Sequence, residues 1–349
     1  MKDVASKAGV ALKTVSRVVN GEAGVTPETA KRVQGAIEDL GFRRNESARL
    51  LRTGQTATLG FIASDWADPD HAAVYQGLEE VARGNGYLLY SGSTDRDLQR
   101  EEQLALAMCA RRVDGLVVIP TPGSHEYLVS EIEAGVAAVF VLRPPTWDGG
   151  AGPSADLVLP DERGGGRTAV AHLIASGHRR IGFVSGDSAG GDSGGAVSGG
   201  GGSGGGGSGG GGSGGGGSGS SGGGTVSHRA AELLAGYNDA MTAAGLTADP
   251  AWTTLTAEQL PGAPVTAVLC ADRTQTGAAL HALAHAPDQP AIVGFGDFAL
   301  ADLVSPPVSV LSYDSVLIGR TAGELLVRRL AGEDSPPRTV HVPVRLVTR

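Results

Sequence analysis

The first twenty residues constrain the fold of this chain most, because two short apolar-periodic segments meet there at one glycine. Residues 4–8 and residues 15–19 each carry an apolar stripe with helical spacing, and Gly9 lies between them. Glycine tolerates the positive φ that a tight turn needs, the small Ala5 allows a close helix crossing, and Val15 has the size to fill it. The pattern predicts a helix-turn-helix, a motif whose second helix lies in the major groove of DNA.

The outer face of the second predicted helix carries side chains suited to DNA. The candidates for base edges, near the start of the helix, are Leu12, Lys13 and Arg17. The candidates for phosphate oxygens, all short hydrogen-bonding side chains, are Thr14, Ser16 and Asn20. The same spacing also fits a small helical hairpin whose basic face is simply solvated.

Charge is divided unevenly along the chain. The 349 residues carry a net charge of −9, yet residues 1–55 hold ten Lys/Arg against six Asp/Glu and are net positive by 4. A basic head on an acidic body is typical of a protein that presents only its N-terminal part to phosphates. Thr26 and Pro27 predict the capped start of a third helix, and Gly41 predicts its end. We therefore expect a three-helix headpiece over residues 1–44.

The remaining sequence alternates buried apolar strands with helical segments, which predicts parallel sheets in an α/β fold. Helix candidates include 125–134, and the last strand candidate runs over 340–346. Some ten such strands predict two doubly wound lobes. The chain begins Met1-Lys2-Asp3 without the apolar segment of a signal peptide. No run approaches the roughly 18 apolar residues of a membrane span, so we expect a cytoplasmic protein without membrane contact. The two cysteines are expected to be buried, reduced thiols.

Taken together, these motifs resemble the LacI/GalR (lactose/galactose-repressor) family of transcriptional regulators. The residues that carry the resemblance are Val4-Ala5-x3-Gly9-Val10-x2-Lys13-Thr14-Val15-Ser16-Arg17-Val18-Val19-Asn20, Val25-x3-Thr29 and Asn45-x2-Ala48-x2-Leu51. The resemblance implies that Thr26 and Thr29 contact phosphates, in addition to the candidates above. It also implies a hinge helix within residues 45–56 that holds Asn45, Ala48 and Leu51 and wedges leucine into the minor groove.

For residues 57–349, the resemblance implies a two-lobed domain like the periplasmic binding proteins (type I), which dimerises and binds an effector. One lobe would comprise about 57–158 and 314–332, and the other about 159–312 and 339–349. The chain would pass between the lobes near 158–161, 288–290 and 312–314. A small molecule, sugar-like by family default, would bind in the cleft between the lobes, at the carboxyl ends of the strands.

Several cleft positions match the family, while others depart from it. The candidate effector-binding residues are Asp68, Arg143, Asp161, Asp272, Asp297 and Tyr313. For Asp68 and Asp161 the alternative role is helix N-capping. The departures include Asp70 and His71 in place of an aromatic pair, Arg273 in place of an aspartate, Leu233 in place of an arginine and Tyr313 in place of a glutamine. The cleft is therefore expected to differ from a typical hexose site.

One segment does not fit an α/β pattern. Residues 199–218 repeat Gly-Gly-Gly-Gly-Ser four times, which predicts a flexible insertion over about 188–227 within the second lobe. The perfect repeat looks like a synthetic linker, although a natural low-complexity insertion has the same composition.

No arrangement of catalytic residues, cofactor-binding residues or metal ligands stands out. The pair His281 and His285 has helical spacing but no evident third ligand, and the glycine runs lack the context of a nucleotide-binding loop. The favoured function is a dimeric, non-enzymatic repressor that binds a pseudo-palindromic operator in double-stranded DNA under the control of a small molecule. The alternative is a small-molecule sensor of the solute-binding type, or an engineered protein with impaired DNA binding.

Overall fold

The computed structural model describes residues 1–19, 22–42, 55–150, 152–153, 155–186, 227–286, 288–299 and 301–349. The chain divides into two compact units, Met1–Thr56 and Ala57–Arg349. The predicted phosphate contact Asn20, the predicted hinge residues Asn45, Ala48 and Leu51, and the insertion up to residue 226 lie outside the described residues.

The first unit is a three-helix headpiece made of α1 (Lys2–Ala8), α2 (Leu12–Val19) and α3 (Pro27–Asp39). Gly9 ends α1 in the left-handed conformation, with φ of 61°, and its backbone N–H and that of Val10 bond back to α1. Val15 is fully buried between the helices. The Arg32 guanidinium of α3 donates to the carbonyl of Ala8 at 2.8 Å, so it ties α3 to the free end of α1.

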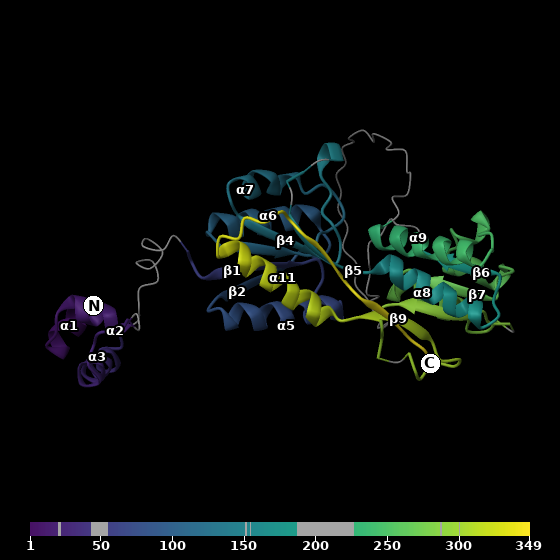
Figure 1. The fold of residues 1–349 in the computed structure, drawn as a ribbon. Coiled ribbons are helices and arrows are strands. Elements are labelled where there is room, and N and C mark those ends of the chain that lie inside the picture. Colours follow the sequence, from purple (N-terminus) through teal and green to yellow (C-terminus); the bar gives the residue numbers. More distant parts are fainter. Residues whose placement is uncertain are drawn as a thin grey trace, which may run out of the picture. The chain divides into compact units, whose positions relative to one another are not determined.

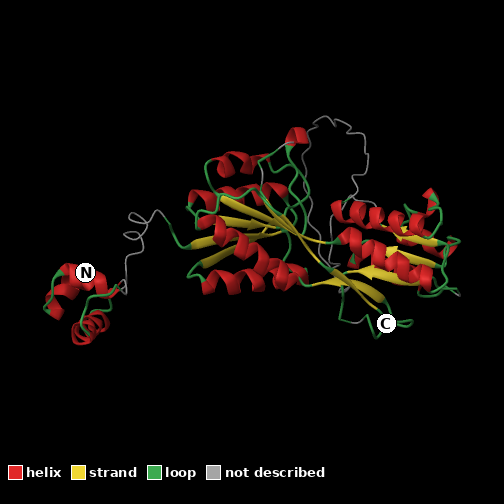
Figure 2. Ribbon diagram, viewed as in Figure 1, coloured by secondary structure: helices red, strands yellow, loops and turns green. Residues whose placement is uncertain are grey.

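The second unit begins with a six-stranded parallel sheet in the order β10-β5-β4-β3-β1-β2 (Figures 1 and 2). Its strands are β1 (Thr58–Ala63), β2 (Leu88–Ser93), β3 (Gly115–Val118), β4 (Ala137–Val141), β5 (Asp156–Pro160) and β10 (Thr339–Val342). One face packs against α5 (Pro69–Gly84) and α11 (Ser315–Leu330). The other face packs against α6 (Leu98–Ala110) and the short segments η1 (Glu126–Leu128) and α7 (Val129–Glu133); η2 (Asp148–Gly150) lies in the loop before β5.

The second sheet has the order β11-β9-β8-β7-β6, and only β11 runs antiparallel to its neighbour. Its strands are β6 (Ile181–Val184), β7 (Ala267–Cys270), β8 (Ala291–Phe295), β9 (Ser309–Tyr313) and β11 (Val344–Val347). Helices α8 (Glu162–Ala175) and α9 (His228–Ala243) cover one face. The other face carries α10 (Arg273–Leu283) and η4 (Ala257–Gly262), with η3 (Pro250–Trp252) preceding η4.

Each sheet is covered by a helix pair that meets at glycines. A Cβ on Gly319 of α11 would lie 1.9 Å from the carbonyl oxygen of Val74 in α5, and one on Gly236 of α9 would lie 2.0 Å from that of Arg163 in α8. The backbones therefore touch where no side chain fits. In both lobes, a close glycine contact between two helices thus accompanies their packing on the sheet.

The structure corrects three details of the expected topology. The strand predicted over 340–346 is two strands in different sheets, because Pro343 has no N–H to continue the ladder. Residues 339–342 therefore belong to the first sheet, not the second lobe. The third passage between the sheets is at Pro343, not at 288–290, which joins α10 to β8 within the second lobe. The helix predicted over 125–134 is only a 3₁₀ turn followed by the short α7.

Candidate functional site

The first candidate site is the outer face of α2 in the headpiece. Leu12 and Lys13 are its first two helical residues and are exposed, and Leu12 keeps 47% of its surface accessible although it is apolar. Arg17 lies about one turn further along and is partly exposed, while Val15 turns inward. An exposed leucine beside two cations at a helix start suits thymine methyls and guanine edges. Whether these side chains contact bases stays a prediction.

The predicted phosphate contacts surround this helix. Thr14 and Ser16 are partly exposed on α2. Thr26 caps α3, because its Oγ1 accepts from the backbone N–H of Thr29 at 3.3 Å and donates to the Thr29 hydroxyl at 2.9 Å. Both threonines therefore stabilise the first turn of α3, and their contact with DNA phosphates remains a prediction.

The second candidate site is at the carboxyl ends of the strands in the second unit. Three of the predicted effector residues are N-caps of the helices that follow those strands. Asp68 accepts from the N–H of Asp70 at 2.8 Å, Asp161 from Gly164 at 2.9 Å and Asp272 from Gln275 at 2.8 Å. A capping carboxylate satisfies a free helix donor, so each of these residues has a structural reason to be aspartate.

The other three predicted effector residues have different surroundings. The Asp297 carboxylate accepts from Arg349 at 2.9 and 3.0 Å. Arg143 is partly exposed directly after Leu142, a residue with φ of 66°. Tyr313 ends β9 and donates its hydroxyl proton to Asp70 at 2.9 Å. Contact of Asp297, Arg143 and Tyr313 with an effector stays a prediction.

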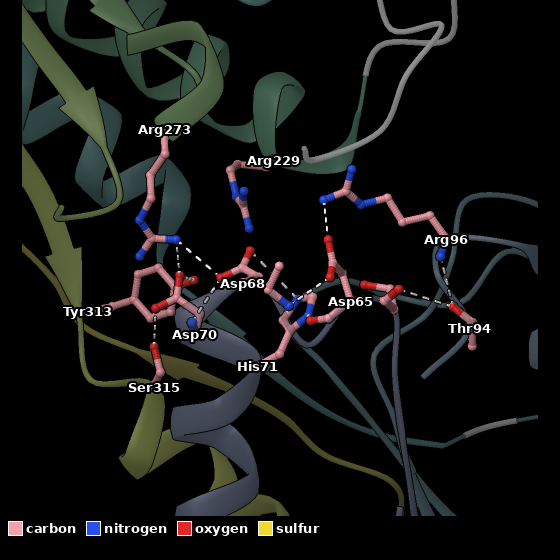
Figure 3. Close-up of polar contacts among 12 residues, drawn as sticks. Asp65, Asp68, Asp70, His71, Thr94, Arg96, Arg229, Arg273, Tyr313 and Ser315 are labelled. Atoms are coloured by element: carbon pink, nitrogen blue, oxygen red, sulfur yellow. Dashed lines mark hydrogen bonds and ion pairs between the residues drawn. The ribbon is translucent and has the colours of Figure 1, made fainter. Parts of the chain in front are cut away.

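A cluster of polar side chains joins the two lobes at Asp70 (Figure 3). Arg273, at the start of α10 in the second lobe, lies 2.8 Å from the Asp70 carboxylate and 3.3 Å from that of Asp68 in the first lobe. Ser315 donates to Asp70 at 2.7 Å, beside the bond from Tyr313. The Arg273 Nε also donates to the carbonyl of Asp297 at 2.7 Å, so the guanidinium is fixed from behind.

Electrostatics keep this cluster ionised. Burial by itself raises the pKa of the Asp70 carboxyl, but the hydrogen bond and charge of Arg273, with the bonds from Ser315 and Tyr313, lower it below its ordinary value. Burial and the charge of Asp70 together raise the pKa of Tyr313 far above its usual range. Tyr313 is therefore a neutral donor and Asp70 a charged acceptor at neutral pH.

Aromatic rings line both sides of this region. In the first lobe, Trp66 is 40% exposed, and its ring centroid lies 5.6 Å from that of Tyr75. In the second lobe, the ring of Phe295 lies 5.7 Å from that of Tyr313 and 5.1 Å from the guanidinium carbon of Arg229. Of these rings, Trp66 is the exposed one, whereas Phe295 is buried. An exposed aromatic face next to hydrogen-bonding groups is typical of sites for small organic ligands.

A pocket of about 450 Å³ lies where the chain passes between the sheets. Asp161 and Pro144 line it, together with Glu162, His228 and His341. Glu162 is buried and holds Arg229 at 3.1 Å. The six predicted effector residues are therefore not gathered at one point: Asp161 lies at this pocket, whereas Asp68 and Tyr313 lie at the Asp70 cluster.

Sequence reasoning missed the residues that hold the cluster together. Asp70 and Arg273 were identified only as departures from the family pattern, and Ser315 was not singled out. The available signal was that an acid and a base had replaced uncharged or oppositely charged residues at two cleft positions.

The described residues contain neither a cluster of metal ligands nor a membrane-spanning helix. In that part of the chain, no three side chains among His, Cys, Asp and Glu are grouped so that they could hold a metal ion. Over the same residues, no helix combines the length and the hydropathy needed to cross a lipid bilayer.

Each of the two units matches the model of a known protein family. Residues 1–45 match the model of the bacterial regulatory proteins of the lacI family, and residues 223–349 match that of the periplasmic binding protein-like domain. The chain is 29% identical to the HTH-type transcriptional regulator CelR of Thermobifida fusca, covering 99% of this chain and 96% of CelR. It is 26% identical to the HTH-type transcriptional repressor PurR of Aliivibrio salmonicida, covering 100% of this chain and 97% of PurR.

A solved structure gives the same assignment. The complex of a transcriptional regulator CelR with cellobiose matches with a TM-score of 0.63 and 26% identity, over 100% of this chain and 98% of that one. A lacI-type headpiece precedes a two-lobed binding-protein fold in one chain, and full-length relatives share that order. The chain thus combines a DNA-binding domain of the lacI type with a periplasmic binding protein-like domain, as its similarity to the regulators CelR and PurR over nearly its whole length indicates.

Proposed function

We propose that this protein is a homodimeric repressor that binds a two-fold symmetric DNA site through α2 and responds to a small molecule in the cleft between its lobes. The observation that carries the proposal is the exposed Leu12 and Lys13 and the partly exposed Arg17 on a helix whose opposite side is anchored by the buried Val15. The rigid core of the headpiece fixes which side chains reach the bases. The acidic remainder of the chain limits phosphate contact to this end.

The dimer is supported by the exposed edge of the first sheet. Strand β2 is the last strand of that sheet, and Leu88 and Tyr90 on it keep 67% and 52% of their surfaces accessible. An open strand edge with large apolar side chains is a template for pairing with another chain. Two headpieces held by such a pair would read the two halves of a pseudo-palindrome.

The proposed effector is a sugar-like molecule that stacks on an aromatic ring and bonds to polar groups in the cleft. Trp66 offers an exposed ring, and Asp68, Asp272 and Arg143 are the candidate polar contacts. The solved CelR relative is a complex with cellobiose, which supports a carbohydrate as the first class to screen. We infer that the protein works in the cytoplasm, where its operator is, and that it acts by binding and not by catalysis.

The experiment is selection of randomised double-stranded DNA by the purified protein at two salt concentrations. We expect a two-fold symmetric site to be enriched and its affinity to fall steeply with salt. Arg17→Ala should weaken that site by about 1–3 kcal/mol and relax the preference at one position of each half-site.

The matched control is Lys31→Ala, which removes one exposed cation from α3. It should change the affinity for the selected site and for random DNA to the same extent. Retention of DNA with no enriched sequence, or an Arg17→Ala variant that binds the selected site as the parent does, would refute the proposal.

A further inference from the structure

The two lobes carry opposite charges at the place where Arg273 meets Asp68 and Asp70. The first lobe presents the carboxylates of Asp68 and Asp70, whose side chains are 13% and 16% exposed, and the second lobe presents Arg273, whose side chain is 25% exposed. These residues lie about 200 positions apart in the chain. Figure 3 shows Arg273 directed at both carboxylates across the junction.

Both partners are held in place by their own lobes. Ser315, in α11 of the first lobe, donates to Asp70, and Asp68 caps α5. On the other side, Arg273 bonds to the carbonyl of Asp297 at the end of β8. Side chains fixed in this way lose little conformational entropy when the ion pair forms. Tyr313, at the end of β9, adds a second bond to Asp70 from the second sheet.

We propose that Arg273, Asp70 and Asp68, with Tyr313, form an interlobe latch that holds the two lobes closed in the absence of an effector. The latch uses the chain's own side chains for the bridging contacts that a ligand would otherwise make. An effector that enters between these residues must separate the ion pair, and a low-dielectric junction makes that separation costly. That last step rests on the proposed role of the cleft, whereas closure of the lobes by the latch does not.

The test measures the distance between the lobes in the full-length protein without effector. Spin labels at Arg83→Cys in the first lobe and Glu258→Cys in the second, both exposed positions, report that distance by pulsed electron resonance. Cys109 is replaced by alanine in all samples, and Cys270 is buried. Labelled protein is mixed with an excess of unlabelled protein so that a dimer carries labels in one protomer only, and we then expect one narrow distance distribution for the unmodified latch.

Asp70→Asn and Arg273→Gln should each shift the population towards longer distances, lowering the closed-to-open ratio about tenfold or more, as expected for a hydrogen bond between charged groups. The double variant should open no further than either single variant, because both remove the same interaction. The swapped pair Asp70→Arg with Arg273→Asp should recover part of the closed population.

The matched control is the pair Asp65 and Arg96. They lie 2.6 Å apart with similar exposure, but both belong to the first lobe. Asp65→Asn should leave the distance distribution unchanged. If Asp70→Asn and Arg273→Gln keep the narrow distribution of the parent, or if Asp65→Asn opens the lobes equally, the latch is refuted.

DNA affinity measured on the same variants separates this inference from the proposed function. Longer distances with unchanged affinity for the selected site would leave the latch standing and refute the coupling of the cleft to DNA. Unchanged distances with altered affinity would refute the latch alone.

Discussion

Replacing Gly319 with alanine puts a methyl group where the backbone of α5 already lies. The new Cβ would be 1.9 Å from the carbonyl oxygen of Val74 and 2.8 Å from its carbonyl carbon. A carbon normally stays about 3.3 Å from a carbonyl oxygen, so α5 and α11 must separate locally by roughly 1.4 Å. The obstacle is backbone, and no change of rotamer relieves it.

The expected cost follows from two opposing terms. Overpacking of a tight interior contact destabilises by about 1–3 kcal/mol, and a backbone obstacle belongs at the upper end of that range. Alanine returns about 1 kcal/mol relative to glycine inside a helix. We therefore expect Gly319→Ala to lower the free energy of unfolding by about 2 kcal/mol, which is roughly 4–8 °C in Tm.

The assay is thermal and urea unfolding of the full chain followed by circular dichroism. Gly277→Ala is the matched control, because Gly277 lies inside α10 and no neighbouring atom comes within 4 Å of the place its new methyl group would take. This variant should gain about 0.5–1 kcal/mol. Gly236→Ala in the second lobe should behave like Gly319→Ala. If Gly319→Ala proves as stable as Gly277→Ala, the argument from helix contact is wrong.

Further predictions concern pH, thiols and the headpiece. The pKa of Asp70 is lower in the folded than in the unfolded chain, so the stabilisation from its ionised carboxylate is complete above the unfolded value of 3.8 and disappears as the pH falls through the lower folded value. The free energies of unfolding of the parent and of Asp70→Asn, measured against pH, should therefore converge at that low pH. A difference in free energy that persists unchanged there would contradict this. Burial raises the pKa of Cys270 to about 12 and that of Cys109 to about 11, so a disulfide reagent at pH 8 should label Cys270 only after unfolding and the partly buried Cys109 slowly; fast labelling of Cys270 in the native protein would contradict its burial. Thr26→Ala removes the cap of α3 and should destabilise the headpiece by about 1 kcal/mol. The measurement is the loss of helical circular dichroism on heating residues 1–56, and an unchanged midpoint temperature would mean that the cap contributes nothing to stability.

Local sequence was sufficient to predict the headpiece and the alternation of strands and helices. Gly9 adopts the positive φ that its place between two apolar stripes requires, and Val15 is buried as its spacing indicates. Thr26, Asp68 and Asp161 cap the helices that begin just after them. Caps, turns and apolar periodicity act over a few residues, so a single sequence contains the information for them.

Tertiary structure alone decided which distant residues meet. The sequence shows a base at Arg273 and an acid at Asp70 but not that they lie 2.8 Å apart. It shows an apolar run around Pro343 but not that the strands on either side join different sheets. Such pairings depend on strand order and on how two lobes close, which arise from contacts between segments far apart in the chain. A periodic pattern specifies which face of a segment is buried, and only the folded chain determines what that face is buried against.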